Sequence, residues 1–171
     1  MPAVALPRKV ATKRVGVTVL RTARADEALG DSLGLPRVRK DVVTPFEVVA
    51  KHFARSGEPG IHDESPSADG LVRVPGPLGL TPARAFRLVY RNERGRAVGY
   101  IHYYPEGVLG AKHPGEYAVN VWCGARRRGI GMALIAEADR LWGLNFHRQD
   151  YTPAGRALAA KYLSSHGTAM A

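Results

Sequence analysis

The chain has 171 residues, of which 45% are hydrophobic, and this size and composition fit one compact domain with a core. Lysine and arginine number 25 against 15 aspartate and glutamate residues, which gives a net charge of +10 at pH 7. The excess of positive charge favours an acidic partner such as nucleic acid, a phosphorylated cofactor or an anionic protein surface. The single cysteine, Cys123, excludes an intramolecular disulfide framework and a zinc site built from several cysteines.

Residues 1–14 contain several arginines and lysines but no sustained hydrophobic periodicity. We therefore predict a basic, flexible arm over 1–14 and a single domain over 15–171. The basic residues of the arm follow its short apolar segment, whereas a secretory signal has the reverse order. No apolar run approaches the roughly 20 residues of a membrane-spanning helix, so we expect a cytoplasmic protein with no membrane partner.

The first half of the domain contains two segments with a readable pattern. The β-branched segment Val15–Leu20 predicts a first strand, and residues 25–34 have a weak helical pattern. A second helix is predicted to begin at Thr44, because Glu47 stands three residues later and completes a capping box. Gly57 is the expected end of this helix.

Residues 58–82 are rich in proline, glycine, serine and aspartate, which predicts a long loop with one short strand at 70–74. His62, Asp63 and Glu64 stand together in this stretch. Metal sites need ligands that converge from a larger cluster. A solvated loop is therefore the favoured interpretation, and we predict no metal site.

The second half of the domain has stronger signals. Two alternating segments joined by a polar, glycine-containing turn predict a hairpin over 85–104. The expected elements after it are a strand at 116–123 buried inside the sheet, an amphipathic helix at 131–142, a short strand at 144–147 and a last helix that Thr152 caps. This order indicates a mixed α/β sheet with helices packed on its faces.

The stretch "CGARRRGIGMALIAEA" from Cys123 to Ala138 lies where a strand ends and a helix begins. Unpaired N–H groups and the positive end of the helix dipole make such a junction an anion site. Gly129 and Gly131 would let a phosphate approach the backbone closely. Three arginines at the same place disfavour the helix unless an anion is present, so this stretch predicts an anionic ligand.

Val121, Cys123, Arg126, Gly129 and Gly131 resemble the signature of the GNAT acyltransferases, in which a strand ending in V-x-P is followed by Q/R-x-x-G-x-G/A at the start of a helix. Cys123 stands where the family has proline. The resemblance, which extends to bacterial and bacteriophage members, implies a central, mostly antiparallel sheet with splayed strands flanked by helices. It also implies an N-acetyltransferase that uses acetyl-CoA.

The resemblance assigns roles to particular residues. Backbone groups near Val121 and Cys123 would hold the pantetheine arm of acetyl-CoA, and those from Arg126 to Gly131 its pyrophosphate. The complete set of expected cofactor-binding residues is Val121, Trp122, Cys123, Arg126, Arg127, Arg128, Gly129, Ile130 and Gly131. Tyr162 resembles the family's tyrosine near the cofactor sulfur and would protonate the leaving thiolate.

The general base is less clear in the sequence. Glu116 opens the strand that leads to the arginines and is the first choice, although strand alternation puts it on the opposite face from Val121. His102, Tyr104 and His147 are alternatives. A mechanism in which the thiol of Cys123 is acylated is disfavoured, because no histidine–aspartate partnership is readable beside it.

The acyl acceptor is an unknown amine, with acidic and nucleic-acid-linked amines both open, and family members often form homodimers. Two other functions remain alternatives. The chain could keep the GNAT fold as a catalytically inactive binding or structural protein, for example a virion component. It could also bind nucleic acid through its positive charge, although aromatic residues make up only 8% of the chain.

Overall fold

The computed structural model describes residues 24–38, 50, 53–65, 71–76 and 79–166. The basic arm, the strand expected at Val15–Leu20 and the helix start expected at Thr44 lie outside those ranges. The named elements are β1 (Gly60–Asp63), β2 (Leu71–Gly76), β3 (Gly79–Arg84), β4 (Phe86–Arg91), β5 (Ala97–Tyr104), β6 (Glu116–Val121), the 3-10 helix η1 (Cys123–Ala125), α3 (Ile130–Trp142) and α4 (Pro153–His166). Residues 24–32 form a further helix, which confirms the weak helical pattern there.

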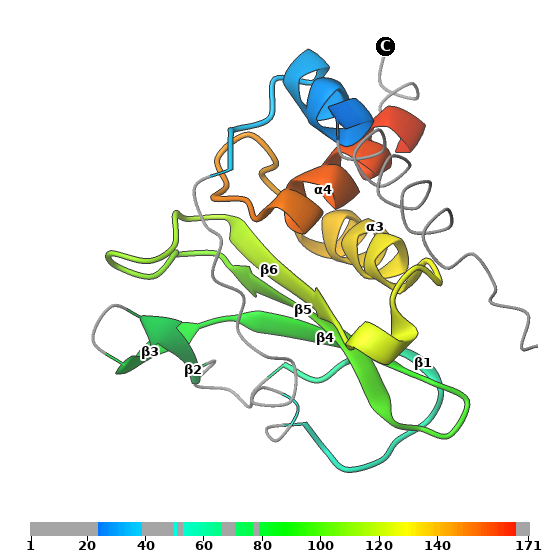
Figure 1. Ribbon diagram of the computed structural model, residues 1–171. Coiled ribbons are helices and arrows are strands. Elements are labelled where there is room, and N and C mark those ends of the chain that lie inside the picture. Colours follow the sequence, from blue (N-terminus) through cyan, green and yellow to red (C-terminus); the bar gives the residue numbers. More distant parts are fainter. Residues whose placement is uncertain (1–23, 39–49, 51–52, 66–70, 77–78, 167–171) are drawn as a thin grey trace, which may run out of the picture.

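The strands form a four-stranded antiparallel sheet in the order β1-β4-β5-β6 and a separate two-stranded ribbon of β2 and β3 (Figure 1). The β4–β5 hairpin is confirmed, with Phe86 opposite Tyr103. Its turn is closed by the side chain of Asn92, whose Oδ1 accepts the N–H groups of Arg94 and Arg96 at 3.0 Å. The expected α+β character of the chain is therefore present.

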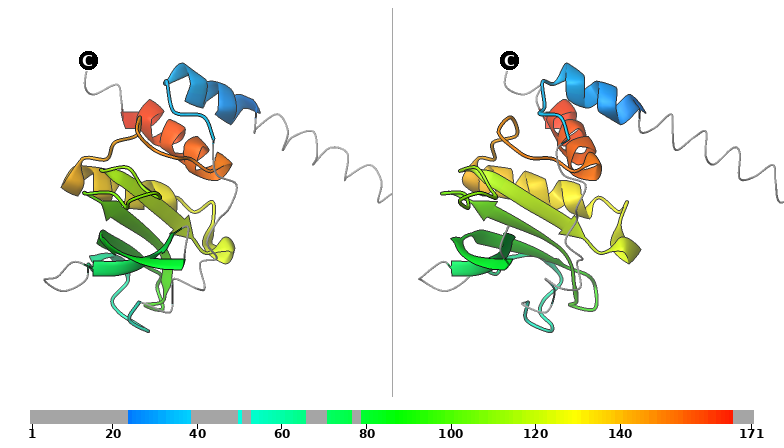
Figure 2. Two further views of the ribbon diagram at one scale, coloured as in Figure 1. Left: turned by 90° about the vertical axis from the view of Figure 1, so that its left-hand side faces the viewer. Right: turned by 60° about the vertical axis from the view of Figure 1, so that its left-hand side comes forward.

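The helices cover one face of the sheet in successive layers. Helix α3 packs on β4, β5 and β6, and α4 packs on α3. Figure 2 shows α3 next to the sheet, α4 beyond it and the helix at 24–32 outermost. The main core lies between α3 and the sheet and includes Ile101, Leu134 and Ile135, each with 0% exposure.

None of the helices in the described part of the chain has the length and apolar character that crossing a bilayer requires.

The helix expected to end at Gly57 ends earlier, because residues 53–59 are not helical. The carbonyl of Ala54 accepts a hydrogen bond from Arg91 Nη2 at 3.1 Å, and the N–H of Gly57 donates to the carbonyl of Gly95 at 3.1 Å. These bonds tie the segment to the β4–β5 hairpin. A glycine ends a helix only where the backbone of the preceding residues has no hydrogen-bond partner outside that helix.

The stretch expected to be a loop with one strand contains more pairing than its composition indicates. β2 confirms the strand expected at 70–74, but β1 and β3 were not expected. β1 pairs with β4, with Gly60 opposite Arg91. The guanidinium of Arg91 is buried and forms an ion pair with Glu64 directly after β1, so this strand depends on a partner distant in sequence.

Two further expectations about the sheet are wrong. Strand β6 lies at the edge of the sheet and not inside it. Residues 144–147 form no strand, so within the described residues β6 has no splayed partner. Side chains satisfy the backbone of this segment instead: Asp139 Oδ1 accepts the N–H of Leu144 at 2.9 Å, and the hydroxyl of Tyr151 donates to the carbonyl of Phe146 at 2.7 Å.

Arg156 fastens α4 to the end of the helix at 24–32. Thr152 caps α4 as expected, its Oγ1 accepting the N–H of Gly155 at 3.1 Å. One turn later the buried guanidinium of Arg156 donates to the carbonyls of Glu27, Leu35 and Pro36 and to the carboxylate of Asp31. This arginine therefore joins the outermost layer to the rest of the fold.

We expect Arg156→Ala to lower the free energy of unfolding by about 2–4 kcal/mol, because several buried acceptors lose a charged donor. Arg140→Ala is the matched control, since Arg140 makes an exposed ion pair with Glu137, and exposed pairs contribute little to stability. Urea unfolding followed by circular dichroism measures both. Equal losses in the two variants would contradict a fastening role for Arg156.

Candidate functional site

The junction between β6 and α3 is the candidate site. The chain leaves β6 at Val121, passes through η1 and enters α3 at Ile130. Gly129 is the N-cap, with φ 78° and ψ 6°, and no side chain from the described part of the chain caps this helix. The first intrahelical bond runs from Ala133 to the carbonyl of Gly129. The N–H groups of the first turn are therefore available to an acceptor from outside the helix.

The conformation at Gly129 gathers these donors. A left-handed residue followed by a helical one turns successive N–H groups toward one point, which forms a concave anion site. A Cβ at Gly129 would meet no atom of the described residues within 4 Å, so they leave space beside it. Gly129 is needed for its backbone conformation, since side chains strongly disfavour a positive φ.

Gly131 lies where α3 packs against α4, and its expected place beside a phosphate stays a prediction. A Cβ at this position would lie 2.9 Å from Leu158 Cδ2, so the glycine lets α3 pack closely against α4. The same turn also packs on the sheet. Ile130 lies directly over Gly99 of β5, where a Cβ would be only 2.8 Å from Ile130 Cγ2. The start of α3 is thus fixed against the sheet on one side and α4 on the other.

The arginines surround this helix end. Arg126, Arg127 and Arg128 are all exposed, and the first turn of α3 contains no acidic residue. Arg126 Nε donates to the carbonyl of Val121 at 3.1 Å, which ties the loop to the end of β6. Arg127 has φ 62°, a strained conformation for a residue with a side chain. Positive charge and strain are therefore concentrated at an uncapped helix N-terminus.

The outer edge of β6 leads directly to this helix end. The N–H of Trp122 donates to the carbonyl of Val98 on β5 at 2.8 Å. Since hydrogen-bonded pairs alternate along an antiparallel ladder, the backbone groups of Val121, Val119 and Tyr117 point away from β5. Within the described ranges, the N–H groups of Val119 and Val121 have no hydrogen-bond partner.

The start of this edge is closed by a side chain. The amide of Gln149 accepts the N–H of Tyr117 at 3.0 Å through Oε1 and donates to the carbonyl of Tyr117 through Nε2. Gln149 therefore takes the place of a neighbouring strand at one residue only. Among the described residues, nothing else pairs with this edge between Tyr117 and the arginines, a feature that the sequence pattern does not indicate.

The candidate site is thus a continuous path with uncapped N–H groups and arginines at the start of α3 and a strip of backbone donors along β6. Trp122 adds apolar surface beside it, being 43% exposed and folded over Gly124. No family model, curated protein or solved structure matches this chain. The chemistry of the path must therefore be read from its own residues.

Glu116 lies at the closed end of β6, five residues from Val121, or roughly 16 Å along an extended strand. It has 0% exposure. Its carboxylate accepts the N–H groups of His113 at 2.7 Å and Asp150 at 3.2 Å and faces Lys112 Nζ at 3.5 Å. These contacts account for its burial as a structural carboxylate, and its role as a base stays a prediction.

Tyr162 lies near the other end of α3. Its hydroxyl donates to Asp139 Oδ2 at 2.7 Å, and its ring stacks on Phe146 and His166. Asp139 is nine residues after Ile130, or about 13 Å along the helix axis. Burial first, and then the hydrogen bond to Asp139, raises the pKa of Tyr162 to about 12. Its role as an acid is a prediction that this contact makes testable.

The other candidate bases have defined surroundings. His102 is buried with its Nδ1 3.3 Å from the hydroxyl of Tyr104, and both side chains lie on the face of β5 turned away from α3. His147 is exposed, with Nε2 3.3 Å from the carbonyl of Leu33. Cys123 is an exposed free thiol. Of the loop trio, His62 contacts Pro59, while Asp63 accepts Ser65 and Glu64 pairs with Arg91.

We expect Tyr162→Phe to lower the free energy of unfolding by about 1–2 kcal/mol at pH 7, because Asp139 loses a donor. The pKa of Tyr162 is raised in the folded protein, so its stabilising contribution is complete below the ordinary tyrosine pKa of about 10 and is lost as the pH rises toward 12. The difference between variant and wild type should therefore shrink above pH 10.

Urea unfolding at several pH values from neutral to alkaline measures this difference. Tyr90→Phe is the control, since Tyr90 is half-buried and makes no hydrogen bond through its hydroxyl in the described part of the chain. A Tyr162→Phe deficit that stays constant with pH would show that the hydroxyl is not held by Asp139.

Proposed function

We propose that this protein is an acetyl-CoA-dependent N-acetyltransferase of the GNAT type that acetylates a primary amine by direct attack. The observation that carries the proposal is the path itself: an uncapped, arginine-rich helix N-terminus that continues into an open strand edge. Coenzyme A has the matching shape, because it joins phosphate groups to a long arm that contains amides. Few other ligands present both features in that order.

Different residues of the path would bind different parts of coenzyme A. The first-turn N–H groups of α3 and the side chains of Arg127 and Arg128 would take the phosphates. The outward N–H of Val121 would pair with an amide carbonyl of the arm and that of Val119 with the thioester carbonyl, as a peptide does when it adds a strand to an exposed edge. Both contacts use backbone that the fold leaves accessible.

The reaction needs no covalent intermediate on the protein. The nitrogen of a neutral amine forms a bond to the thioester carbonyl carbon, the C–S bond breaks, and the amine gives up one proton while the thiolate gains one. The N–H of Val119, the outward donor nearer the reactive end of the ligand, would stabilise the oxyanion that forms at the thioester carbonyl. Glu116 and Tyr162 are the residues proposed for the two proton transfers, and their observed partners, His113, Asp150 and Asp139, would have to release them.

We expect acetyl-CoA and free coenzyme A to bind the wild-type chain with micromolar affinity in isothermal titration. Arg127→Glu/Arg128→Glu should weaken binding at least about tenfold, because charge-assisted contacts contribute about 1.5–3 kcal/mol each. Arg55→Glu/Arg94→Glu is the control: both residues are exposed, the change in net charge is the same, and affinity should stay near that of the wild type.

Absence of any binding to the wild type would overturn the proposal and leave the arginines as a basic surface for a macromolecular partner. Equal weakening in both double variants would show that only the net charge of the protein matters and that no cradle exists at α3.

A second test addresses the strand edge. Val119→Pro removes an N–H that points away from β5, so it should leave the sheet bonds intact. We expect this variant to bind acetyl-CoA about tenfold more weakly, which corresponds to one lost hydrogen bond. Val119→Ala loses similar packing but keeps the N–H and should bind normally. Equal affinities in the two folded variants would show that the ligand does not use this edge.

A further inference from the structure

The end of the sheet where β5 begins and β6 ends is rich in arginine. Three segments meet there: residues 53–59, the β4–β5 turn at 92–96 and the loop at 122–129 that leads into α3. The N–H of Gly57 donates to the carbonyl of Gly95, and the N–H of Trp122 donates to the carbonyl of Val98 at the start of β5. Figure 1 and Figure 2 show the turn and the loop at the same end of the sheet in each view, so the three segments form one surface.

Six exposed arginines on these segments define the arginine-rich end: Arg55, Arg94, Arg96, Arg126, Arg127 and Arg128. In the part of the chain that the structure describes, none of their side chains forms an ion pair. One makes a hydrogen bond, from Arg126 Nε to the carbonyl of Val121. The same segments contain two carboxylates, Glu58 and Glu93, both exposed. The positive charge of this end is therefore largely uncompensated, which favours a polyanion.

The residue type favours phosphate. All six cations are arginines, and a planar guanidinium donates two parallel N–H groups to a phosphate, whereas a lysine ammonium is a point charge. Arg94 follows β4 and Arg126 follows β6, and β5 separates these two strands by about 10 Å across the sheet. Arginines that far apart contact different phosphates, so the ligand that fits them carries a row of phosphate groups.

Trp122 adds an aromatic platform between the two groups of arginines. It is hydrogen-bonded to Val98, two residues after Arg96, and it precedes Arg126 by four residues. Its ring packs on Gly124, where a Cβ would lie 2.7 Å from the indole, and yet the residue is 43% exposed. A fixed and exposed ring can stack on a nucleic-acid base. Because the base must be unpaired to stack there, the platform favours a single strand over a duplex.

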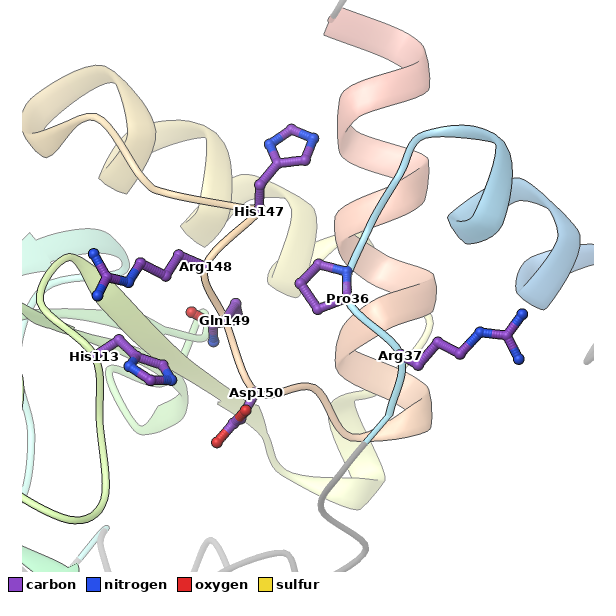
Figure 3. A pocket seen from close by; sticks show the side chains of 7 residues that line it. All are labelled: Pro36, Arg37, His113, His147, Arg148, Gln149 and Asp150. Carbon is purple, nitrogen blue, oxygen red and sulfur yellow. The ribbon is translucent and has the colours of Figure 1, made fainter.

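The cations at the opposite end of β6 do not converge in this way. A pocket of about 430 Å³ lies there, and its lining includes Arg148, His113 and Asp150. Figure 3 shows the guanidinium of Arg148 and the ring of His113 pointing in opposite directions. Two divergent cations do not hold one phosphate chain, so the arginine-rich end is the stronger candidate for a polyanion.

We propose that the arginine-rich end binds a single-stranded nucleic acid, with its phosphates on the arginines and one base stacked on Trp122. This binding function does not rest on the proposed acetyl transfer. Arg127 and Arg128 belong to both sites, whereas Arg55 and Arg94 belong to the nucleic-acid surface alone. Variants of the latter pair therefore separate the two proposals.

Fluorescence anisotropy of the full chain with labelled strands of about 12 nucleotides tests the surface, because single-strand sites cover about 4–16 nucleotides. We expect single-stranded RNA and DNA to bind with micromolar affinity at low salt, and a DNA duplex to bind more weakly. Arg55→Glu/Arg94→Glu should weaken single-strand binding at least about tenfold. It should also lower the slope of log affinity against log salt by about 1.4, since each lost phosphate contact removes about 0.7.

Arg24→Glu/Lys161→Glu is the matched control. Both residues are exposed, they lie on the helices beyond α3, and the change in net charge is the same (Figure 2). Single-strand affinity should stay near that of the wild type. Equal weakening in the two double variants would show that only the net charge matters, and this would overturn the proposal.

Variants of Trp122 test the platform. Trp122→Ala should weaken single-strand binding about fivefold or more and leave duplex affinity unchanged, whereas Trp122→Phe keeps a ring and should bind nearly as well as the wild type. A Trp122→Ala variant that binds single strands normally, or a duplex that binds more tightly than either single strand, would contradict the assignment to a single strand.

Two further outcomes would refute the proposal. One is the absence of binding to either single strand at low salt. The other is displacement of the RNA by poly-L-glutamate at an equal concentration of charge, which would assign the surface to an acidic polypeptide. Titration with coenzyme A reads the acetyltransferase proposal separately, because Arg55 and Arg94 lie outside that site.

Discussion

The pairing of Gln149 with Tyr117 decides the form of the candidate site. A buried N–H or carbonyl without a partner costs about 1–3 kcal/mol, so the start of β6 needs either another strand or a substitute for one. The amide of Gln149 supplies both a donor and an acceptor, and the buried carboxylate of Glu116 fixes the flanking loops. These contacts hold the segment 147–151 against the start of β6, and no described residue pairs with the rest of the edge.

The opposite end of the path depends on helix packing. The start of α3 is enclosed by Gly99 below Ile130 and by Leu158 beside Gly131, and α4 is itself fastened to the outermost helix through Arg156. The uncapped N–H groups therefore sit on a rigid base. Rigid donors favour anion binding, because little conformational entropy is lost when the ligand arrives.

Local signals in the sequence predicted local structure well. The alternation on either side of Asn92, the apolar spacing in α3 and the cap at Thr152 each act within a few residues, and each element formed. The strand at 144–147, the helix end at Gly57 and the interior position of β6 were wrong, because distant side chains decide them. Asp139, Arg91 and Gln149 occupy backbone groups that the sequence pattern alone would assign to a strand or a helix.

The candidate site also combines features that local sequence predicts with contacts that distant residues make. The arginines and the uncapped helix start could be located from a strand that runs into a glycine-rich helix entry. The contacts of Glu116 with Asp150, 34 residues away, and of Tyr162 with Asp139, 23 residues away, could not. Arg126, Arg127 and Arg128 at a positive helix end repel the dipole, which weakens the fold without a ligand. An anion bound there would relieve this repulsion. Binding would then be coupled to folding, so the free energy of unfolding should rise as the anion concentration exceeds its dissociation constant.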